Sequence, residues 1–259
     1  MKTEFCSAPH ERVDLCCDYY RLSDYQSFAE VLAFYEQQRA AAPDHQWLLT
    51  LDDLAQADYT SCHACMSHDL DDVSTLSTAL DLSHLPATRF EDGKHVGYLQ
   101  LPAEMIIRQT HFQQHLAETS FQQVLDRNIG FTTDYDVDFL TANQRPLSVV
   151  DNVILLIKVP VSEPLEALLG LPNGYFTSDL SPMESYRLAE RLQRDFGYRL
   201  LGVGASYLGF YQTRMLTSAD VTQLLMLMQQ VYRDITQEEL RHVEQVVTSQ
   251  PLLLLSYTE

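Results

Sequence analysis

The chain has 259 residues with 36 acidic and 17 basic side chains, which gives a formal net charge of −19. A negative field of this size repels nucleic acid and anionic membranes, and it attracts cationic proteins over long distances. The hydrophobic content of 46% is enough for a buried core, and the apolar runs are too short to cross a bilayer. Five cysteines and the absence of a leader-like apolar run near Met1 predict a cytoplasmic protein with reduced thiols.

Residues 1–145 are predicted to form a mainly helical half. Apolar side chains recur there at helical spacing, and prolines separate the segments. In chain order, the expected elements are a helix over 27–41, a strand over 47–51, a loop with a helical turn over 69–85, a strand over 96–101 and a helical stretch over 104–127.

Residues 146–259 give clearer signals. The apolar run 153–159 predicts a central strand buried on both faces. Three capping boxes, which begin at Ser181, Thr217 and Thr236, predict three helices. Two strands joined by a Gly204-Ala205-Ser206 turn are expected between the first and second helix, and a last strand over 251–257. The predicted fold is α+β, a mixed sheet with a C-terminal strand-helix-hairpin-helix unit.

The stretch 153–234 is similar to a known protein family. Its Leu171-Pro172-Asn173-Gly174-Tyr175 turn and its Phe196-Gly197 pair before two strands resemble bacterial domain of unknown function family 4253. Phe176 and Thr177 depart from the tryptophan or glycine that often follows the turn in that family. The resemblance implies an α+β fold over residues 146–259 and a bacterial origin, and it implies no activity. Some relatives look like small acidic proteins that neutralise antibacterial toxins.

The sharpest local cluster is Cys62-His63-Ala64-Cys65 followed by His68. A Cys-x-x-Cys pair is one half of a structural zinc site, so Cys62, Cys65 and His68 are candidate zinc ligands. A fourth ligand could come from Cys6, His10, Cys16 or Cys17. Buried or surface thiols without metal are the alternative reading, because no second Cys-x-x-Cys follows at zinc-finger spacing.

Two acidic segments are the candidate partner-binding surface. Alternating aspartates at 134, 136 and 138 share one face if that segment is extended. They could instead chelate a hard cation, but the setting of a calcium loop is absent. The candidate contact residues are Asp52, Asp53, Asp58, Tyr59, Asp69, Asp71, Asp72, Asp134, Tyr135, Asp136 and Asp138, with the tyrosines as aromatic anchors.

No hydrolase, metalloprotease or phosphate-loop motif is present, and Gly202-x-Gly204 lies between two predicted strands, so it favours a hairpin over a nucleotide site. We therefore expect a non-enzymatic immunity-type protein without a cofactor that neutralises a cationic partner, a cognate toxin domain, by direct binding. Nucleic acid and membranes are not expected as partners. The alternative is a zinc metalloprotein or enzyme built on the Cys62/Cys65/His68 cluster.

Overall fold

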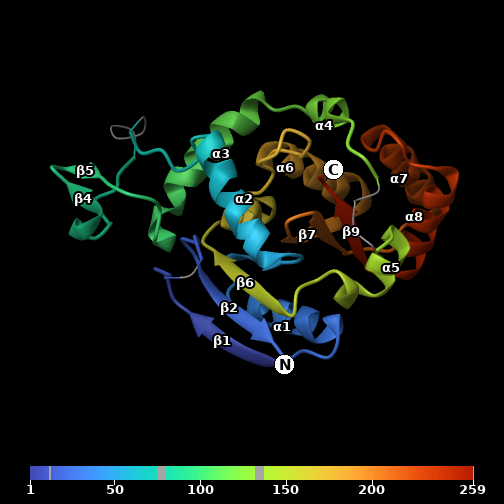
Figure 1. Cartoon of the computed structure of the whole chain (residues 1–259), viewed down its shortest axis with the longest axis horizontal. Helices are drawn as coiled ribbons and strands as arrows, with labels where there is room; N and C mark the ends of the chain where they lie inside the picture. The colour runs from blue at the N-terminus through green and yellow to red at the C-terminus, as the bar shows by residue number, and fades with distance from the viewer. Residues whose placement is uncertain (12, 75–79, 132–136, 259) are drawn as a thin grey trace.

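The computed structural model describes residues 1–11, 13–74, 80–131 and 137–258. Within these residues seven strands form one mixed sheet in the order β1-β2-β6-β3-β7-β8-β9 (Figure 1). Strands β3 and β7 pair in parallel, and the other neighbours are antiparallel. The strands are β1 (Lys2–Cys6), β2 (Asp18–Ser23), β3 (Gln46–Thr50), β6 (Val153–Val159), β7 (Tyr198–Val203), β8 (Tyr207–Gln212) and β9 (Leu252–Ser256).

Helices cover both faces of this sheet. Side chains alternate along β6, so Leu155 and Ile157 join one core while Ile154 and Leu156 join the other. Helix α1 covers the second face. The other helices supply the first, larger core or, in the case of α5, pack against it. The helices are α1 (Phe28–Ala41), α2 (Leu54–Ser67), α3 (Met105–Glu118), α4 (Phe121–Arg127), α5 (Phe139–Gln144), α6 (Pro182–Phe196), α7 (Ser218–Val231) and α8 (Gln237–Ser249). The chain is therefore an α+β protein, as predicted.

The expectations for the C-terminal half are confirmed in detail. Strand β6 occupies the predicted residues and is buried on both faces, between β2 and β3. The capping boxes at Ser181, Thr217 and Thr236 open α6, α7 and α8, because each hydroxyl accepts a bond from a first-turn amide while the acidic side chain bonds back. Since β6 pairs with strands from the N-terminal half on both sides, the predicted boundary at residue 145 does not separate two sheets.

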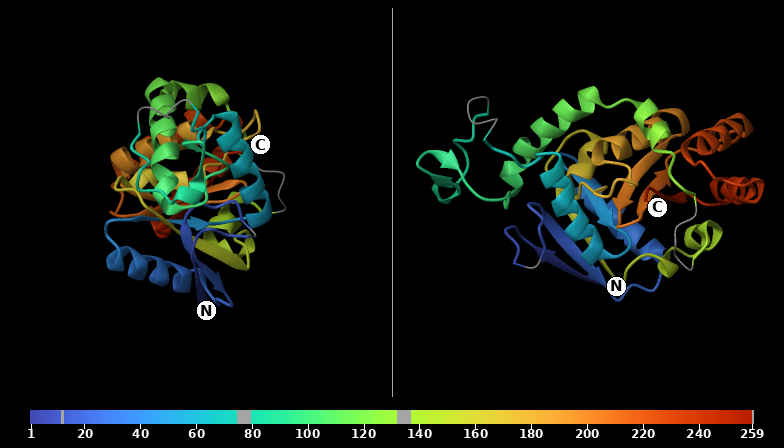
Figure 2. Two further views of the ribbon diagram at one scale, coloured as in Figure 1. Left: turned by 90° about the vertical axis from the view of Figure 1, so that its left-hand side faces the viewer. Right: turned by 45° about the horizontal axis from the view of Figure 1, so that its top comes forward.

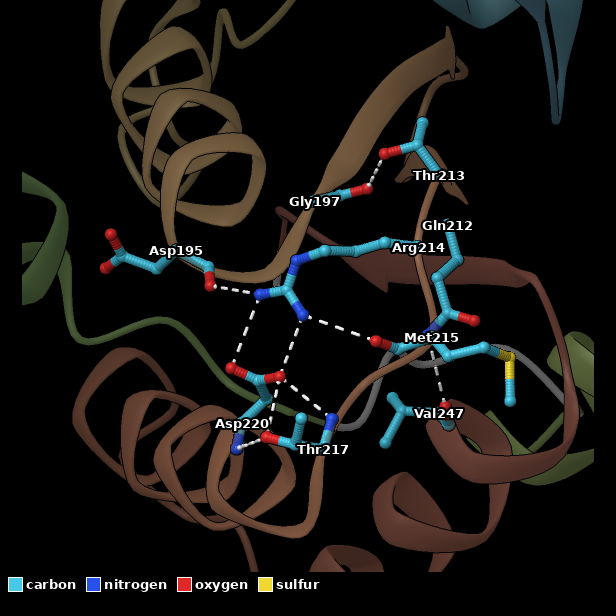
Figure 3. A network of polar contacts seen from close by, with 9 residues as sticks. All are labelled: Asp195, Gly197, Gln212, Thr213, Arg214, Met215, Thr217, Asp220 and Val247. Atoms are coloured by element: carbon cyan, nitrogen blue, oxygen red, sulfur yellow. Dashed lines mark hydrogen bonds and ion pairs between the residues drawn. The ribbon is translucent and has the colours of Figure 1, made fainter.

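Arg214 joins the end of α6 to the start of α7, as Figure 3 shows. Its guanidinium donates to the Asp195 carbonyl at 2.8 Å and to the Asp220 carboxylate at 2.8 Å. Asp220 also accepts from the Thr217 amide and hydroxyl. The Arg214 bond, followed by the Thr217 bonds, holds the pKa of the Asp220 carboxyl well below the usual range. Gly197 takes a left-handed φ of 72°, and a Cβ there would lie 2.8 Å from the Arg214 Cγ. The glycine thus lets Arg214 lie against the helix end.

Two expectations for the first half need correction. Residues 96–101 form no strand: the Glu104 carboxylate accepts from the Gln100 and Leu101 amides, so side-chain bonds replace a ladder. The helical stretch 104–127 is two helices, because Ser120 opens α4 with its own capping box. Helix α2 and strands β1 and β2 were not predicted.

Residues 86–104 form an extension that projects from the body of the molecule (Figure 1; Figure 2, right). Its centre is polar. Fully buried Glu104 accepts from Arg89 at 2.5 Å and from His95 Nε2 at 2.7 Å. These bonds outweigh burial and lower the pKa of the Glu104 carboxyl. The extension contains short 3-10 turns (Ala87–Arg89, Pro102–Glu104) and the two-stranded hairpin β4 (Phe90–Glu91) and β5 (Lys94–His95).

Candidate functional site

The predicted Cys/His cluster lies on and after helix α2. Cys62 and Cys65 are one turn apart and both line a cavity, whereas His68 follows the helix outside that lining and stacks edge-on with His115 at 6.1 Å. All five cysteines are free thiols. Within the described ranges, no group of three or more His, Cys, Asp or Glu side chains is arranged to hold a metal ion.

The electrostatics of these thiols work against a thiolate. Burial raises the pKa of the Cys65 thiol strongly, although the nearby Arg108 opposes the shift. Burial also raises the pKa of Cys62, and the carboxylates of Asp14 and Asp58 add to that effect. Because zinc binds the thiolate form, both shifts disfavour the zinc ligands that the sequence suggested.

Asp52 is not a contact residue, contrary to the prediction. It is 6% exposed and follows β3, where its carboxylate accepts from the Ser206 amide at 2.9 Å and the Tyr207 amide at 3.2 Å. Its carboxylate thereby braces the turn between β7 and β8. Desolvation raises the pKa of this carboxyl to about 7, against the backbone bonds that favour its ionised form. The buried side chain therefore offers a partner almost no contact surface.

Asp71 is also paired with another side chain of the same protein. Its carboxylate forms a bidentate ion pair with Arg108, with bonds of 2.7 and 2.8 Å, so its charge is compensated. Asp72 accepts from the Ser74 amide and hydroxyl, and Asp69 is exposed in a left-handed backbone conformation. The segment 69–72 therefore offers fewer carboxylates to a partner than the sequence predicted.

The remaining predicted residues have different roles. Asp53 caps α2 by accepting from the Gln56 amide, and Asp58 accepts from the Asp14 amide; both aspartates still face solvent at least in part. Asp138 caps α5 by accepting from the Thr141 amide, and its pKa is lowered by that bond. The other members of the second acidic segment, Asp134, Tyr135 and Asp136, lie outside the described residues.

Tyr59 is exposed as predicted, and it begins a continuous run of rings. The Tyr59 ring meets His63 at 4.4 Å, His63 meets Tyr175 at 4.8 Å, and Tyr175 meets Phe176 at 5.3 Å between ring centroids. Tyr59, Tyr175 and Phe176 are 56%, 39% and 50% exposed. These four residues, Tyr59, His63, Tyr175 and Phe176, are called the aromatic face below.

The turn at 171–175 brings the second half of the aromatic face to α2. Asn173 is buried and donates to the Gly204 carbonyl at 3.2 Å, which ties the turn to the β7–β8 connection. Gly174 has a φ of 114°, and a Cβ there would lie 1.8 Å from the Leu180 carbonyl oxygen. The 171–175 turn thus places Tyr175 beside His63.

Helix α2 and Arg127 bring no uncompensated positive charge to the aromatic face. Helix α2 carries no lysine or arginine. Asp179 accepts from the Phe176 amide at 3.0 Å, and burial raises the pKa of its carboxyl to about 6. Arg127, which donates to the Thr177 carbonyl, is paired with Glu184 at 2.9 Å. Helix α2 therefore adds no positive charge beside the rings, and the positive charge of Arg127 is compensated.

Sequence reasoning missed His63, Tyr175 and Phe176. A helix prediction over 54–67 would have placed Tyr59 and His63 on one face, four residues apart, but no sequence pattern links them to residue 175. Comparison with known proteins adds no further assignment, because no family model, no curated protein and no solved structure matches the chain. Among the described helices, none has the length and apolar character needed to span a membrane.

Proposed function

We propose that this protein is a non-enzymatic binding protein of the immunity type, which docks a cationic toxin domain on its aromatic face and neutralises it by covering its active surface. The observation that supports the proposal most is the run of four rings contributed by two segments more than 110 residues apart. Exposed tyrosine and phenylalanine side chains are the residue types that anchor protein interfaces.

Exposing these rings to water is energetically unfavourable, and binding a partner removes them from water. An isolated apolar side chain on a surface is ordinary, but contiguous exposed rings form a patch that water solvates poorly. Met66, on the same helix, is 55% exposed and adds apolar area. Covering such a patch stabilises a complex by roughly 25 cal/mol for each Å² of apolar surface removed from water.

Charge supports a cationic partner. The net charge of −19 attracts such a partner from a distance, and the lack of lysine and arginine on α2 removes local repulsion at the docking site. Steering of this kind raises the association rate more than the final affinity. A toxin that acts on nucleic acid carries the positive surface that this arrangement would meet.

The experiment starts by co-purifying the partner from cells that make the protein and then producing that partner alone. The affinity of the pure partner is measured for wild-type protein and for Tyr59→Ala and Phe176→Ala. We expect each substitution to weaken binding at least tenfold, because loss of an interface anchor costs about 2 kcal/mol or more.

Phe5→Ala is the matched control, since Phe5 is also 50% exposed but lies on the edge strand β1. It should leave the affinity unchanged. Co-expression should also relieve any growth defect that the partner alone causes. A partner that binds Tyr59→Ala and Phe176→Ala as tightly as wild type would contradict the proposed surface.

A further inference from the structure

A cavity of about 870 Å³ lies between helix α2, the start of α3 and the projecting extension. It does not involve the four rings of the aromatic face. Its volume falls in the range of small-molecule sites, roughly 300–1,000 Å³. The residues that matter for its chemistry are Asp14, Cys62, Asp69, Lys94, His95, Tyr98 and Arg108.

Buried ion pairs fix both walls of the cavity. On one side Arg108 is held by Asp71, and its remaining amine donates to the Leu169 carbonyl at 2.8 Å. On the other side Glu104 holds Arg89 and His95 in the extension. Charge-assisted bonds of this kind are strong and directional, so the cavity is positioned before any ligand arrives.

The free charge in the cavity is negative. Arg108 is neutralised by Asp71, and the raised pKa values keep the Cys62 and Cys65 thiols uncharged. The exposed Asp14 and Asp69 remain at the wall, and Lys94 is the other basic side chain among the lining residues that the structure describes. The lining thus favours a cation over an anion.

His95 provides a second, independent indication. Its side chain is 1% exposed, and its Nε2 lies 2.7 Å from the Glu104 carboxylate. A carboxylate accepts only, so Nε2 donates to it. No described residue bonds to the buried Nδ1 of the same ring. A buried polar atom without a partner is costly, and a ligand in the adjoining cavity can satisfy it.

Tyr98 adds an aromatic surface at the same cavity. Its side chain is exposed, although its own carbonyl accepts from Arg89, so its backbone is fixed while its ring is uncovered. An aromatic face attracts ammonium and guanidinium groups through its quadrupole. Apolar neighbours, Val13, Leu15, Val73 and Leu99, also line the cavity and can pack against the carbon portion of a ligand.

We propose that this cavity binds an organic cation, a ligand that carries an ammonium or guanidinium group on an apolar stem. Asp14 and Asp69 pair with the charge, Tyr98 covers it, and a polar group of the ligand bonds to His95 Nδ1. The ligand is either a free polyamine or a lysine or arginine side chain presented by a protein, and these share the same recognition chemistry. The site is separate from the aromatic face and does not rest on the function proposed above.

The test is isothermal titration of the full chain with two probes at low ionic strength. The first is spermidine, and the second is the blocked tripeptide acetyl-Gly-Arg-Gly-amide. We expect one site per chain for at least one probe. Tighter binding of spermidine would assign the site to a free amine, and tighter binding of the peptide would assign it to a protein side chain.

Three exposed residues supply variants that should fold normally. Asp14→Asn combined with Asp69→Asn should lower the association constant at least tenfold, since two charge-assisted bonds are lost. Asparagine also tolerates the left-handed conformation at position 69. Tyr98→Ala should lower the association constant about threefold.

Asp44→Asn is the matched control, because Asp44 is exposed and lies outside the cavity lining. It should change binding less than about twofold, since an exposed charge at a distance contributes little. The proposal is overturned if neither probe binds at one site, or if the Asp14/Asp69 variant binds like wild type. Equal weakening by Asp44→Asn would also overturn it, because the binding would then be a diffuse response to net charge.

Discussion

The sheet body and the projecting extension are held together by different forces. In the body, apolar side chains on both faces of strands such as β6 form two cores. In the extension, Glu104 takes the place of a core, with bonds from Arg89, His95 and two backbone amides. Loss of one apolar member leaves a cavity in a shared core, whereas loss of one charge leaves its partner buried and uncompensated. The first two predictions below test this difference, and the other two test single polar groups of the body.

Glu104→Ala should have the largest effect. Without the carboxylate, the largely buried Arg89 guanidinium has no opposite charge, which costs about 3–5 kcal/mol in comparable buried pairs. Hydrogen exchange should show rapid opening confined to residues 86–104, with the protection of β6 unchanged. If the whole sheet exchanged faster to the same degree, the extension would not be a separate unit of stability.

Leu156→Ala should come next and act globally. Leu156 is fully buried on β6, so its truncation leaves a cavity and should lower the free energy of unfolding by about 3 kcal/mol. Urea unfolding measures the loss, and exchange should accelerate across the sheet. An effect confined to a few residues would contradict the assignment of Leu156 to a shared core.

Asp52 should make stability depend on pH. Its pKa of about 7 exceeds that of an unfolded aspartate, so the folded state binds more protons in the window between them. The free energy of unfolding should therefore fall as the pH rises from about 4 to 7, by about 3 kcal/mol. Asp52→Asn should flatten this slope, and an unchanged slope would assign the pH dependence to another group.

Ser181→Ala should have the smallest effect. It removes the side-chain half of the capping box at the start of α6, where the hydroxyl accepts from the Glu184 amide at 3.3 Å. Loss of an N-cap costs about 1 kcal/mol. Urea unfolding should show this modest loss, and Ser181→Asp, which restores an acceptor, should recover most of it.

The two regions also differ in how far sequence predicts them. Caps and periodicity are local signals, so α6, α7, α8 and the β7–β8 hairpin could be predicted from residues a few positions apart. The extension could not, because its apolar segment 96–101 resembles a strand while its backbone bonds to Arg89 and Glu104 instead. The structure of this segment is set by a network of charged side chains, and such a network leaves no periodic pattern in the sequence.

The candidate site was only partly predictable for the same reason. Tyr59 and the excess of carboxylates are visible in the sequence. The sequence does not show that Asp52 is buried or that an ion pair compensates the charge of Asp71. His63 and Tyr175 meet only because a glycine turn and the β7–β8 connection bring two distant segments together. Such contacts depend on tertiary structure, which neither composition nor spacing records.

The most direct test of the proposed function is the association rate of the purified partner as a function of ionic strength. Wild-type protein should associate at least tenfold more slowly when salt rises from about 20 to 200 mM, because screening removes electrostatic steering. Tyr59→Ala should show the same salt dependence but a faster dissociation rate, since the ring acts after the encounter. An association rate indifferent to salt, or a Tyr59→Ala dissociation rate equal to wild type, would contradict docking of a cationic partner on the aromatic face.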